Sequence, residues 1–400
     1  MSRPQPDPAA LDDLDLLDPQ VHAAHDLTPL WRRLRAHDPV RRHDRFWSVT
    51  RHADVLRVVR DPDTFTSLQG NMLRTLLRGH DPGAGKMIVV TDGPKHAGLR
   101  RLLTPGFGPR TLGPVTRSIT EATRDLLAAL VRRGGGDFVA EVAAQVPLRA
   151  ICDLLGVPEH DRLRVLELTG EAMLGETPAT SDMAVRIAQS EILLYYTRLA
   201  AERRTAPGDD IISLLVSGEA ELTEEEVLLN CYNLIIGGDE TARLAMAGGL
   251  LALATYEEEW ARLRADPSLV ETATEEILRW TTPAAHVGRM AVREAEIGGR
   301  RIGKGEVVAL WTASANRDEA VFDEPDRFDV GRRPNKHLTF GYGPHFCLGA
   351  QLARAEIRAL LSELRRTVSA VEVTGPVTWL PSNFVNGVAT LPVALSAGAL

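Results

Sequence analysis

The sequence has few cysteines and no segment that looks like a secretion signal. Only 3 of its 400 residues are cysteine, and Cys152, Cys231 and Cys347 are far apart and form no CxxC pair. This scarcity argues against a disulfide framework and against a structural zinc site, and it fits a reducing cytoplasm. The first twenty residues are rich in proline and aspartate and lack the charged-then-apolar order of a signal peptide. We expect residues 1–20 to be a flexible segment.

The chain also lacks an excess of positive charge. Its formal net charge is −8, which argues against a nucleic-acid-binding protein. Two stretches are more basic than the chain as a whole. Residues 93–120 contain five basic residues and no acidic one, and residues 331–366 contain seven Lys or Arg against two Glu. These stretches predict a local basic surface on an acidic protein.

Hydrophobic residues make up 44% of the chain, enough for a large core, and their spacing predicts mostly helices with short strands between them. Helices are expected at residues 27–35, 53–59, 113–131, 141–155, 159–174 and 183–203. Strands are expected at residues 40–49 and 307–311, with a hairpin turn at 297–300 and further strands within 371–395. Ser268 and Glu271 have the spacing of a capping box at the start of a helix.

Residues 222–256 form the longest helical pattern, and Thr223 with Glu226 predicts a capping box at its start. Such a helix would span on the order of 50 Å. A membrane span is disfavoured because a central charge costs ~3 kcal/mol on insertion. The polar residues within the run are Asn230, Asn233, Asp239, Glu240 and Arg243.

The middle of this helix has an unusual composition. Gly237 and Gly238 each cost ~1 kcal/mol relative to alanine inside a helix, and Asp239, Glu240 and Thr241 follow them directly. A flat cofactor pressed against the helix, with a small ligand beside it, would benefit from the missing side chains and from the polar groups. Thr241 is placed to bond the Gly237 carbonyl one turn earlier and so to open a local groove.

A second unusual stretch is Phe340-Gly-Tyr-Gly-Pro-His-Phe-Cys-Leu-Gly349. Its glycines and proline predict a tight turn, and a helical pattern starts at or just after Cys347. A cysteine at a helix start sees the positive end of the helix dipole, which favours its thiolate. The glycines also let a flat cofactor lie against the backbone.

The pattern Phe-Gly-x-Gly-x-His-x-Cys-x-Gly resembles the haem-binding signature of the cytochrome P450 family, and Gly-Gly-Asp-Glu-Thr is similar to that family's oxygen-binding helix. The resemblance implies a mainly α fold with small β-sheets (α+β), a single domain over residues 21–400, and a long central helix over haem b (iron protoporphyrin IX). It implies Cys347 as the axial iron ligand. Glu240 and Thr241 match the acid–alcohol pair that delivers protons to dioxygen; many relatives carry a second Ser or Thr nearby, where this chain has Ala242 and Arg243.

The same resemblance implies how the cofactor is held. His96 and Arg100 stand at i and i+4 of a helical pattern, on one face. With Arg289 and His345 they match the family's partners of the haem propionates. The other residues expected to contact the cofactor are Gly237, Gly238, Phe340, Gly341 and Gly349.

Two further groups match by position. Glu276 and Arg279 resemble the family's Glu-x-x-Arg pair, and Arg327 is the expected third member of this structural brace of the cysteine loop. Residues 67–90 are expected to be a long loop. Together with residues 168–203, 282–287 and 382–385 they are expected to surround the substrate, with a loop at residues 177–180 in the lid. Residues expected in the substrate pocket are Ala284, Ala285, His286 and Phe384. His286 faces either the pocket or the sheet behind it, and a histidine with satisfied hydrogen bonds that binds no ligand is the favoured interpretation.

The implied activity is that of a bacterial monooxygenase, which uses dioxygen and two electrons from a ferredoxin and its reductase to hydroxylate or epoxidise an organic substrate. The two basic stretches are then expected to form the docking face for the acidic electron donor. No membrane or nucleic-acid partner is expected. The substrate is a small molecule or is bound to a carrier protein, for example an amino acid or acyl group of secondary metabolism.

Three alternatives remain open at the level of sequence. Cys347 with His345 could form a cysteine hydrolase, although no third orienting group is evident. The chain could be a non-catalytic recruitment module on the same fold. It could also keep haem and use peroxide, which the Glu240–Thr241 pair disfavours.

Overall fold

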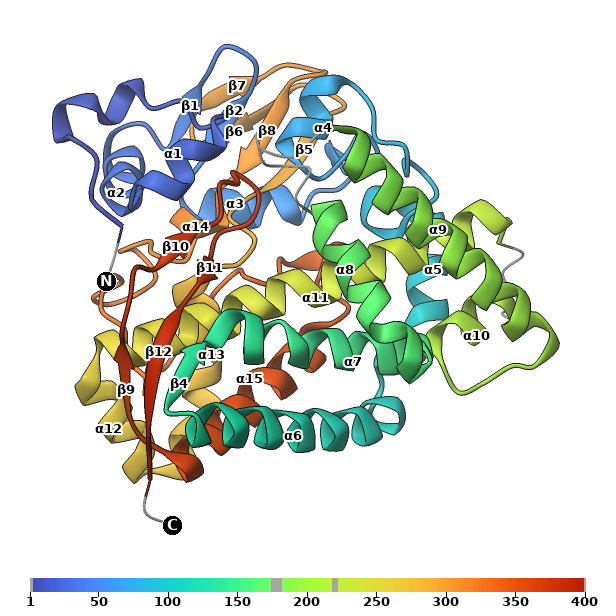
Figure 1. The fold of residues 1–400 in the computed structure, drawn as a ribbon. Coiled ribbons are helices and arrows are strands. Elements are labelled where there is room, and N and C mark those ends of the chain that lie inside the picture. The colour runs from blue at the N-terminus through green and yellow to red at the C-terminus, as the bar shows by residue number, and fades with distance from the viewer. Residues whose placement is uncertain (1–2, 174–181, 218–221, 399–400) are drawn as a thin grey trace.

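The longest helix of the described chain, α11, crosses the middle of the molecule, and the other elements are arranged around it (Figure 1). The computed structural model describes residues 3–173, 182–217 and 222–398. The predicted loop at residues 177–180 lies outside these ranges. The fold is mainly α with small β-sheets, as the sequence predicts.

The α-helices are α1 (Pro19–Ala24), α2 (Thr28–His37), α3 (His52–Val59), α4 (Leu73–Arg78), α5 (Gly93–Leu103), α6 (Pro109–Arg132), α7 (Gln145–Leu155), α8 (Arg162–Met173), α9 (Asp182–Thr205), α10 (Ile211–Ser217), α11 (Glu224–Thr255), α12 (Glu257–Ala265), α13 (Val270–Thr281), α14 (Thr312–Ala315) and α15 (Ala350–Thr367). The strands are β1 (Val40–Arg42), β2 (Trp47–Val49), β3 (Phe65–Thr66), β4 (Gly135–Asp137), β5 (Val287–Ala291), β6 (Ala295–Ile297), β7 (Arg300–Ile302), β8 (Val307–Leu310), β9 (Val368–Val373), β10 (Thr378–Trp379), β11 (Val388–Thr390) and β12 (Pro392–Ala397).

The largest sheet has the order β1-β2-β8-β5-β3, in which only the β2–β8 pair is parallel. It lies near α1, α2 and α4 at the upper end of the molecule in Figure 1. The C-terminal strand β12 pairs with β9 and with β4, and β10 pairs with β11. The predicted hairpin at residues 297–300 is present as β6–β7.

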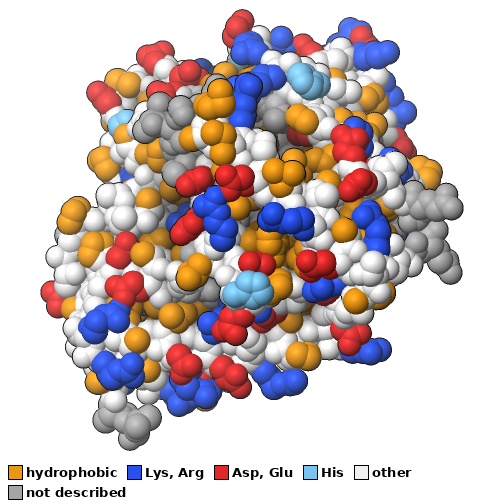
Figure 2. Space-filling view, turned by 45° about the vertical axis from the view of Figure 1, so that its right-hand side comes forward, with side chains coloured by type: hydrophobic (Ala, Val, Ile, Leu, Met, Phe, Trp, Pro, Cys, Tyr) orange, Lys and Arg blue, Asp and Glu red, His pale blue; other side chains and the backbone are white. Residues whose placement is uncertain are grey.

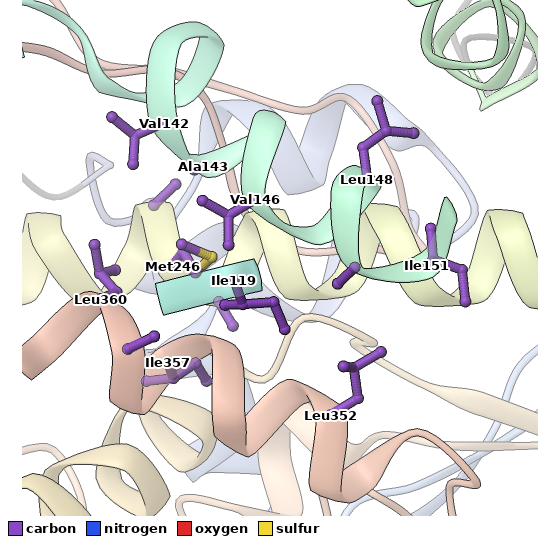
Figure 3. Close-up of a cluster of buried hydrophobic side chains, with 14 of the residues drawn as sticks. Ile119, Val142, Ala143, Val146, Leu148, Ile151, Met246, Leu352, Ile357 and Leu360 are labelled. Atoms are coloured by element: carbon purple, nitrogen blue, oxygen red, sulfur yellow. The ribbon is translucent and has the colours of Figure 1, made fainter. Parts of the chain in front are cut away.

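The main core lies between α6, α7, α11 and α15. Figure 3 shows Ile119, Val146, Met246 and Ile357 from these four helices pointing toward one another. Each of the four has an exposed fraction of zero. Burying aliphatic side chains of this size stabilises a fold by ~1.5–3 kcal/mol each, so this cluster fixes how α15 and α11 face each other.

The start of α11 is fixed by the predicted capping box. The Glu226 amide donates to Thr223 Oγ1, and the Thr223 amide donates to Glu226 Oε2 at 2.8 Å. Further along, Asn230 is fully buried and bonds twice to the end of the 67–90 segment: its Oδ1 accepts from the Ile88 amide and its Nδ2 donates to the Lys86 carbonyl, both at 2.9 Å. The last residues of that segment are therefore fastened to α11.

Two expectations about local structure need correction. The second capping box is wrong: Asp266 caps a short 3₁₀ turn, Pro267–Leu269, by accepting from the Ser268 amide, and α13 starts afterwards without a side-chain cap. Residues 67–90 are not simply a loop, because they contain α4 and the 3₁₀ turn Ile88–Val90. In the segment expected to be flexible, Leu11 and Leu16 are buried in a cluster with Trp31 and Trp311.

The surface carries both signs of charge. Figure 2 shows one face, on which Lys and Arg side chains are interspersed with Asp and Glu. Many of the arginines form exposed ion pairs, such as Arg301 with Glu294. None of the helices in the described part of the chain is both long enough and apolar enough to cross a bilayer.

Candidate active site

Cys347 lies in the irregular loop between Leu338 and α15, three residues before the helix begins. Its amide donates to the Phe340 carbonyl at 2.9 Å, which closes the loop. Gly341 and Gly343 have φ angles of +66° and +74°, and a Cβ on Gly343 would lie 3.0 Å from the Val59 carbonyl oxygen. These backbone positions therefore require glycine, as the loop prediction assumed.

The Cys347 side chain is exposed to an internal cavity. Loss of water raises the pKa of its thiol, while the Gly349 amide and the positive charges of Arg100 and Arg354 act in the opposite direction. The protein therefore stabilises a Cys347 thiolate only in part, and a bound cation would stabilise it further. This donor chemistry fits a metal ion ligated by sulfur.

The cavity measures about 310 Å³ and is mostly apolar. One wall is α11 and the other is the cysteine loop with the start of α15. The predicted residues that line it are His96, Arg100, Gly237, Gly238, Thr241, Ala284, Arg289, Phe340, Gly341, His345, Cys347 and Gly349. The fold thus brings together segments that are about 250 residues apart in the chain.

Cationic and imidazole side chains form one group at this cavity. The His96 and His345 rings are 4.2 Å apart, and His345 Nε2 bonds Asp92 Oδ1 at 2.8 Å. Although burial opposes it, hydrogen bonds from His345, Thr66 and Ser67 hold the pKa of Asp92 below its usual value. The Asp92 carboxylate is therefore already bound by His345, Thr66 and Ser67.

Arg289 is the buried arginine of this group and has no counterion among the described residues. It is buried, its Nη1 donates only to the Gly288 carbonyl, and no described carboxylate lies within ion-pair distance. Burial lowers the pKa of its guanidinium to about 10. A buried cation without a counterion is costly, so the site fits a ligand that carries carboxylates.

The two glycines of α11 have different roles. A Cβ on Gly237 would meet nothing within 4 Å, because this position opens onto the cavity. A Cβ on Gly238 would lie 2.9 Å from Ile151 Cδ1, on the side where α7 packs (Figure 3). Thr241 Oγ1 donates to the Gly237 carbonyl at 3.1 Å, the bond that the sequence predicts.

Glu240 does not line the cavity. It is buried and bound by Arg243, whose Nε donates to Glu240 Oε2 at 3.1 Å. The neighbouring Asp239 is also buried, and its Oδ1 has no hydrogen-bond partner among the described residues. Burial, followed by the negative charge of Glu240, raises the pKa of Asp239 to about 7.

Glu356 is a cavity residue that the sequence reasoning missed. It is fully buried on α15, lines the cavity, and neither carboxylate oxygen has a described partner. Burial, and then the charge of Asp239, raises its pKa well above the ordinary value. The available signal was a lone carboxylate on the apolar face of a helix, one turn after Leu352 and one turn before Leu360.

The structural brace has a different third member from the predicted one. Arg279 donates from Nε and Nη2 to the two oxygens of Glu276 at 2.8 and 2.7 Å, and both side chains are fully buried. Arg332, not Arg327, supplies the second guanidinium, with Nε 3.1 Å from Glu276 Oε2. The Arg327 side chain is exposed and pairs with Glu324, while its backbone carbonyl accepts from both buried arginines.

Three of the four predicted pocket residues lie away from the cavity lining. His286 is fully buried: its Nδ1 bonds the Asn383 carbonyl at 2.9 Å, and its Nε2 accepts from the Leu73 amide at 3.1 Å. The Ala285 amide donates to the Phe384 carbonyl, which ties the tail of the chain to the segment before β5. Of this set only Ala284 reaches the cavity, because backbone pairing turns the others aside.

Comparison with known proteins agrees with this geometry. The family model for cytochrome P450 matches residues 186–367. Cytochrome P450 NovI of Streptomyces niveus is 42% identical to this chain over 99% of both proteins, and a steroid C26-monooxygenase of Mycobacterium tuberculosis is 34% identical over 96% of this chain and 97% of its own. The crystal structure of P450 OxyD, described as involved in the biosynthesis of vancomycin-type antibiotics, superposes with a TM-score of 0.88 at 36% identity, covering 96% of this chain and all of that one.

The chain therefore belongs to the cytochrome P450 family. Its relatives include proteins named as monooxygenases and hydroxylases, and its enzyme class is that of a cytochrome P450 monooxygenase. Family membership implies a haem with a thiolate ligand, and the exposed sulfur, the uncompensated arginine and the open Gly237 position fit that cofactor.

Proposed function

We propose that this protein binds haem b through Cys347 and inserts one oxygen atom from dioxygen into an organic substrate. The observation that carries the proposal is the single cavity onto which the Cys347 side chain, the cationic group and Thr241 all open. Bound haem with a thiolate ligand supplies dioxygen activation, in which two electrons and two protons leave one oxygen in the product and one in water.

The chain's own residues supply binding and protons. Arg289, Arg100, His96 and His345 would hold the two carboxylates of the cofactor, and Asp92 fixes the His345 ring. Gly237 leaves room for its flat face. Thr241 presents a hydroxyl whose proton is directed to the Gly237 carbonyl, so its oxygen is available to accept from a ligand or water in the cavity.

We propose that electrons arrive from a ferredoxin and its reductase at the surface beside the cysteine loop. Arg101, Arg110 and Arg117 are exposed, and no described carboxylate pairs with them; the same holds for Arg333 and Lys336. Between α6 and α15 lies a groove lined by Phe107, Leu112 and Ala359. An acidic donor would be steered to this surface by charge and could pack on the groove.

The substrate class is proposed from the neighbours and from the cavity. Structures of similar fold include P450 OxyD and the cytochrome P450 PksS of the bacillaene polyketide synthase, so secondary metabolism is the favoured setting. The cavity is mostly apolar, and apart from the buried Glu356 its acidic and basic side chains are those given to the cofactor. An amino acid or acyl group presented on a carrier protein, whose charged end stays outside, is the substrate we propose. Titration of free and pantetheine-linked amino acids against the haem spectrum tests this; a response to free acids alone contradicts it.

The haem assignment is tested by spectroscopy. The reduced protein exposed to carbon monoxide should show the red-shifted Soret band of a thiolate-ligated haem, and Cys347→Ser should lose it while Cys152→Ser keeps it. Retention of the band by Cys347→Ser contradicts the assignment. A folded protein that takes up no haem would instead favour a recruitment module, and product formation with peroxide at the rate seen with ferredoxin would favour a peroxygenase.

A further inference from the structure

A second cavity, of about 360 Å³, lies further along α11 than the haem cavity. It is enclosed by the N-terminal segment, the start of α2, the second half of α11, the end of α13 and the β10–β11 region. No described residue lines both cavities. Leu244 and Gly248 of α11 face the second one, whereas Thr241 and Ala245 face the first.

The walls of this second cavity are aromatic and offer unused hydrogen-bond donors. Of the six tryptophans in the chain, Trp47, Trp260 and Trp311 lie outside this cavity, and each donates its indole N–H to a protein oxygen. The other three line the cavity, and among the described residues none of them has an acceptor: Trp31, Trp280 and Trp379. The Tyr256 hydroxyl, in the same wall, has no described partner either.

Two arginines lie against these aromatic rings. The guanidinium carbon of Arg3 is 4.2 Å from the centre of the Trp379 ring, and that of Arg317 is 3.9 Å from the centre of the Trp280 ring. Arg3 donates from Nη1 to the His22 carbonyl and from Nη2 to Asn386 Oδ1, the latter at 3.0 Å, and no described carboxylate pairs with it. Stacked arginines keep their N–H groups directed outward in the ring plane, where they can bind an anion.

The charges around the cavity do not cancel. Three arginines line it against two aspartates, which leaves one positive charge in excess. Asp326 is engaged by Arg32 and by Arg317, and Asp26 Oδ1 accepts from the amide and hydroxyl of Thr28. Burial lowers the pKa of His22 to about 4, so this ring is neutral and adds no charge.

We propose that this second cavity binds a planar aromatic carboxylate. The carboxylate would accept from the N–H groups of Arg3 that are not bonded to His22 and Asn386, and the ring would lie among Trp31, Trp280 and Tyr256. The lining is rich in donors and poor in free acceptors, so it selects a ligand that accepts hydrogen bonds and carries negative charge. This site does not depend on the chemistry of the haem cavity.

The test is calorimetric titration of the haem-loaded protein with naphthalene-2-carboxylate and, as the neutral match, 2-naphthamide. The iron-binding inhibitor 4-phenylimidazole is added first, to fill the haem cavity. We expect one carboxylate per chain with a Kd below ~1 mM, at least ten times tighter than the amide. Arg3→Gln should weaken the carboxylate at least tenfold and leave the amide unchanged, and Trp280→Leu should weaken both.

Arg300→Gln serves as the control, because Arg300 is exposed on β7 and pairs only with Asp38 among the described residues. It should bind like the parent protein. Equal affinity for carboxylate and amide overturns the proposal, as does unchanged binding by Arg3→Gln, competition by 4-phenylimidazole, or the absence of any heat up to the solubility limit. Because Arg3 also contacts His22, Asn386 and Trp379, unchanged binding of the amide by Arg3→Gln is the evidence that the cavity keeps its shape in this variant.

Discussion

Arg243 binds the carboxylate of Glu240 from one turn further along α11, with Nε 3.1 Å from Oε2 and with side chains that are only 18% and 10% exposed. The acid expected to deliver protons is therefore held by a cation in its own helix and is turned from the cavity. Proton delivery through Glu240 requires this ion pair to loosen, and the strength of the pair is measurable.

A double-mutant cycle on Glu240→Gln and Arg243→Gln should give a coupling energy of about 1–3 kcal/mol in chemical denaturation. The pair is largely shielded from water, and breaking it leaves a buried charge unpaired. Arg327 and Glu324 form the matched control, with the same i,i+3 spacing but exposed side chains. Their cycle should give less than ~1 kcal/mol. Equal values for the two cycles would show that Glu240 is effectively solvated.

Thr241→Ala should separate electron consumption from product formation. Losing a positioned hydroxyl that handles a proton typically costs ~10²–10⁴ in rate. We expect product per electron pair to fall by about tenfold or more and peroxide to appear, with Thr241→Ser close to the parent. The ratio of product to reduced cofactor consumed checks this, and unchanged coupling in the alanine variant contradicts the role given to Thr241.

Gly237→Ala and Gly238→Ala should fail in different ways. The Gly238 variant forces a methyl group against Ile151 and should destabilise the protein by ~1–3 kcal/mol. The Gly237 variant meets no protein atom and should gain up to ~1 kcal/mol in the absence of haem from helix propensity.

Haem binding should distinguish the two variants further, because the new methyl group of Gly237→Ala would enter the cavity. Gly237→Ala should weaken haem retention or shift the Soret band, whereas Gly238→Ala should bind haem normally once folded. Melting curves with and without haem measure both effects. The interpretation of Gly237 as cofactor space is contradicted if its alanine variant holds haem like the parent.

Asp239→Asn should change how stability depends on pH. The folded-state pKa of Asp239 is raised to about 7, so folding favours its protonated form, and the stability of the parent falls as pH rises from ~4 to 7. The asparagine variant lacks this loss. Its relative stability should grow across that window by roughly 2–4 kcal/mol and level off above pH 7.

Glu240 and Arg243 on α11 and Glu356 on α15 act on the same carboxyl and are kept unchanged in this comparison. Asp125→Asn, at an exposed position of α6, is the control and should show no such slope. Urea midpoints between pH 4 and 8 measure the difference. Parallel pH profiles for the parent and Asp239→Asn would place that carboxyl in contact with water.

Arg332→Ala should destabilise the protein far more than Arg327→Ala. Arg332 is a buried partner of Glu276 and also donates to the Asp323, Glu324 and Arg327 carbonyls, so its loss should cost ~2–4 kcal/mol. The Arg327 side chain makes one exposed ion pair and should cost under ~1 kcal/mol. Denaturation midpoints decide between them, and a larger loss at Arg327 would restore the original prediction.

Features encoded by nearby residues were the most predictable from sequence. The capping box of Thr223 and Glu226, the Thr241 bond to the Gly237 carbonyl and the turns at Gly341 and Gly343 all depend on residues within a few positions. Their backbone geometry follows from local chemistry, so a single sequence is sufficient to predict them.

Features that depend on how distant segments meet were predicted less well. Arg327 and Arg332 are both basic and both near Glu276 along the chain, and only the path of the backbone between them decides which side chain turns inward. The orientation of His286 depends on Asn383 and Leu73, which lie far away in sequence. Glu356 carries no motif of its own, and its importance emerges only from the absence of a partner.

The attachment of Lys86 and Ile88 to Asn230 limits how the molecule can admit a substrate. If residues 67–85 move outward, Lys86 and Ile88 stay bonded to Asn230 on α11. The hinge of such a movement therefore lies before Lys86. Asn230→Ala would remove these two hydrogen bonds, so a longer part of the segment could move. The opening to the cavity would then be wider and less selective.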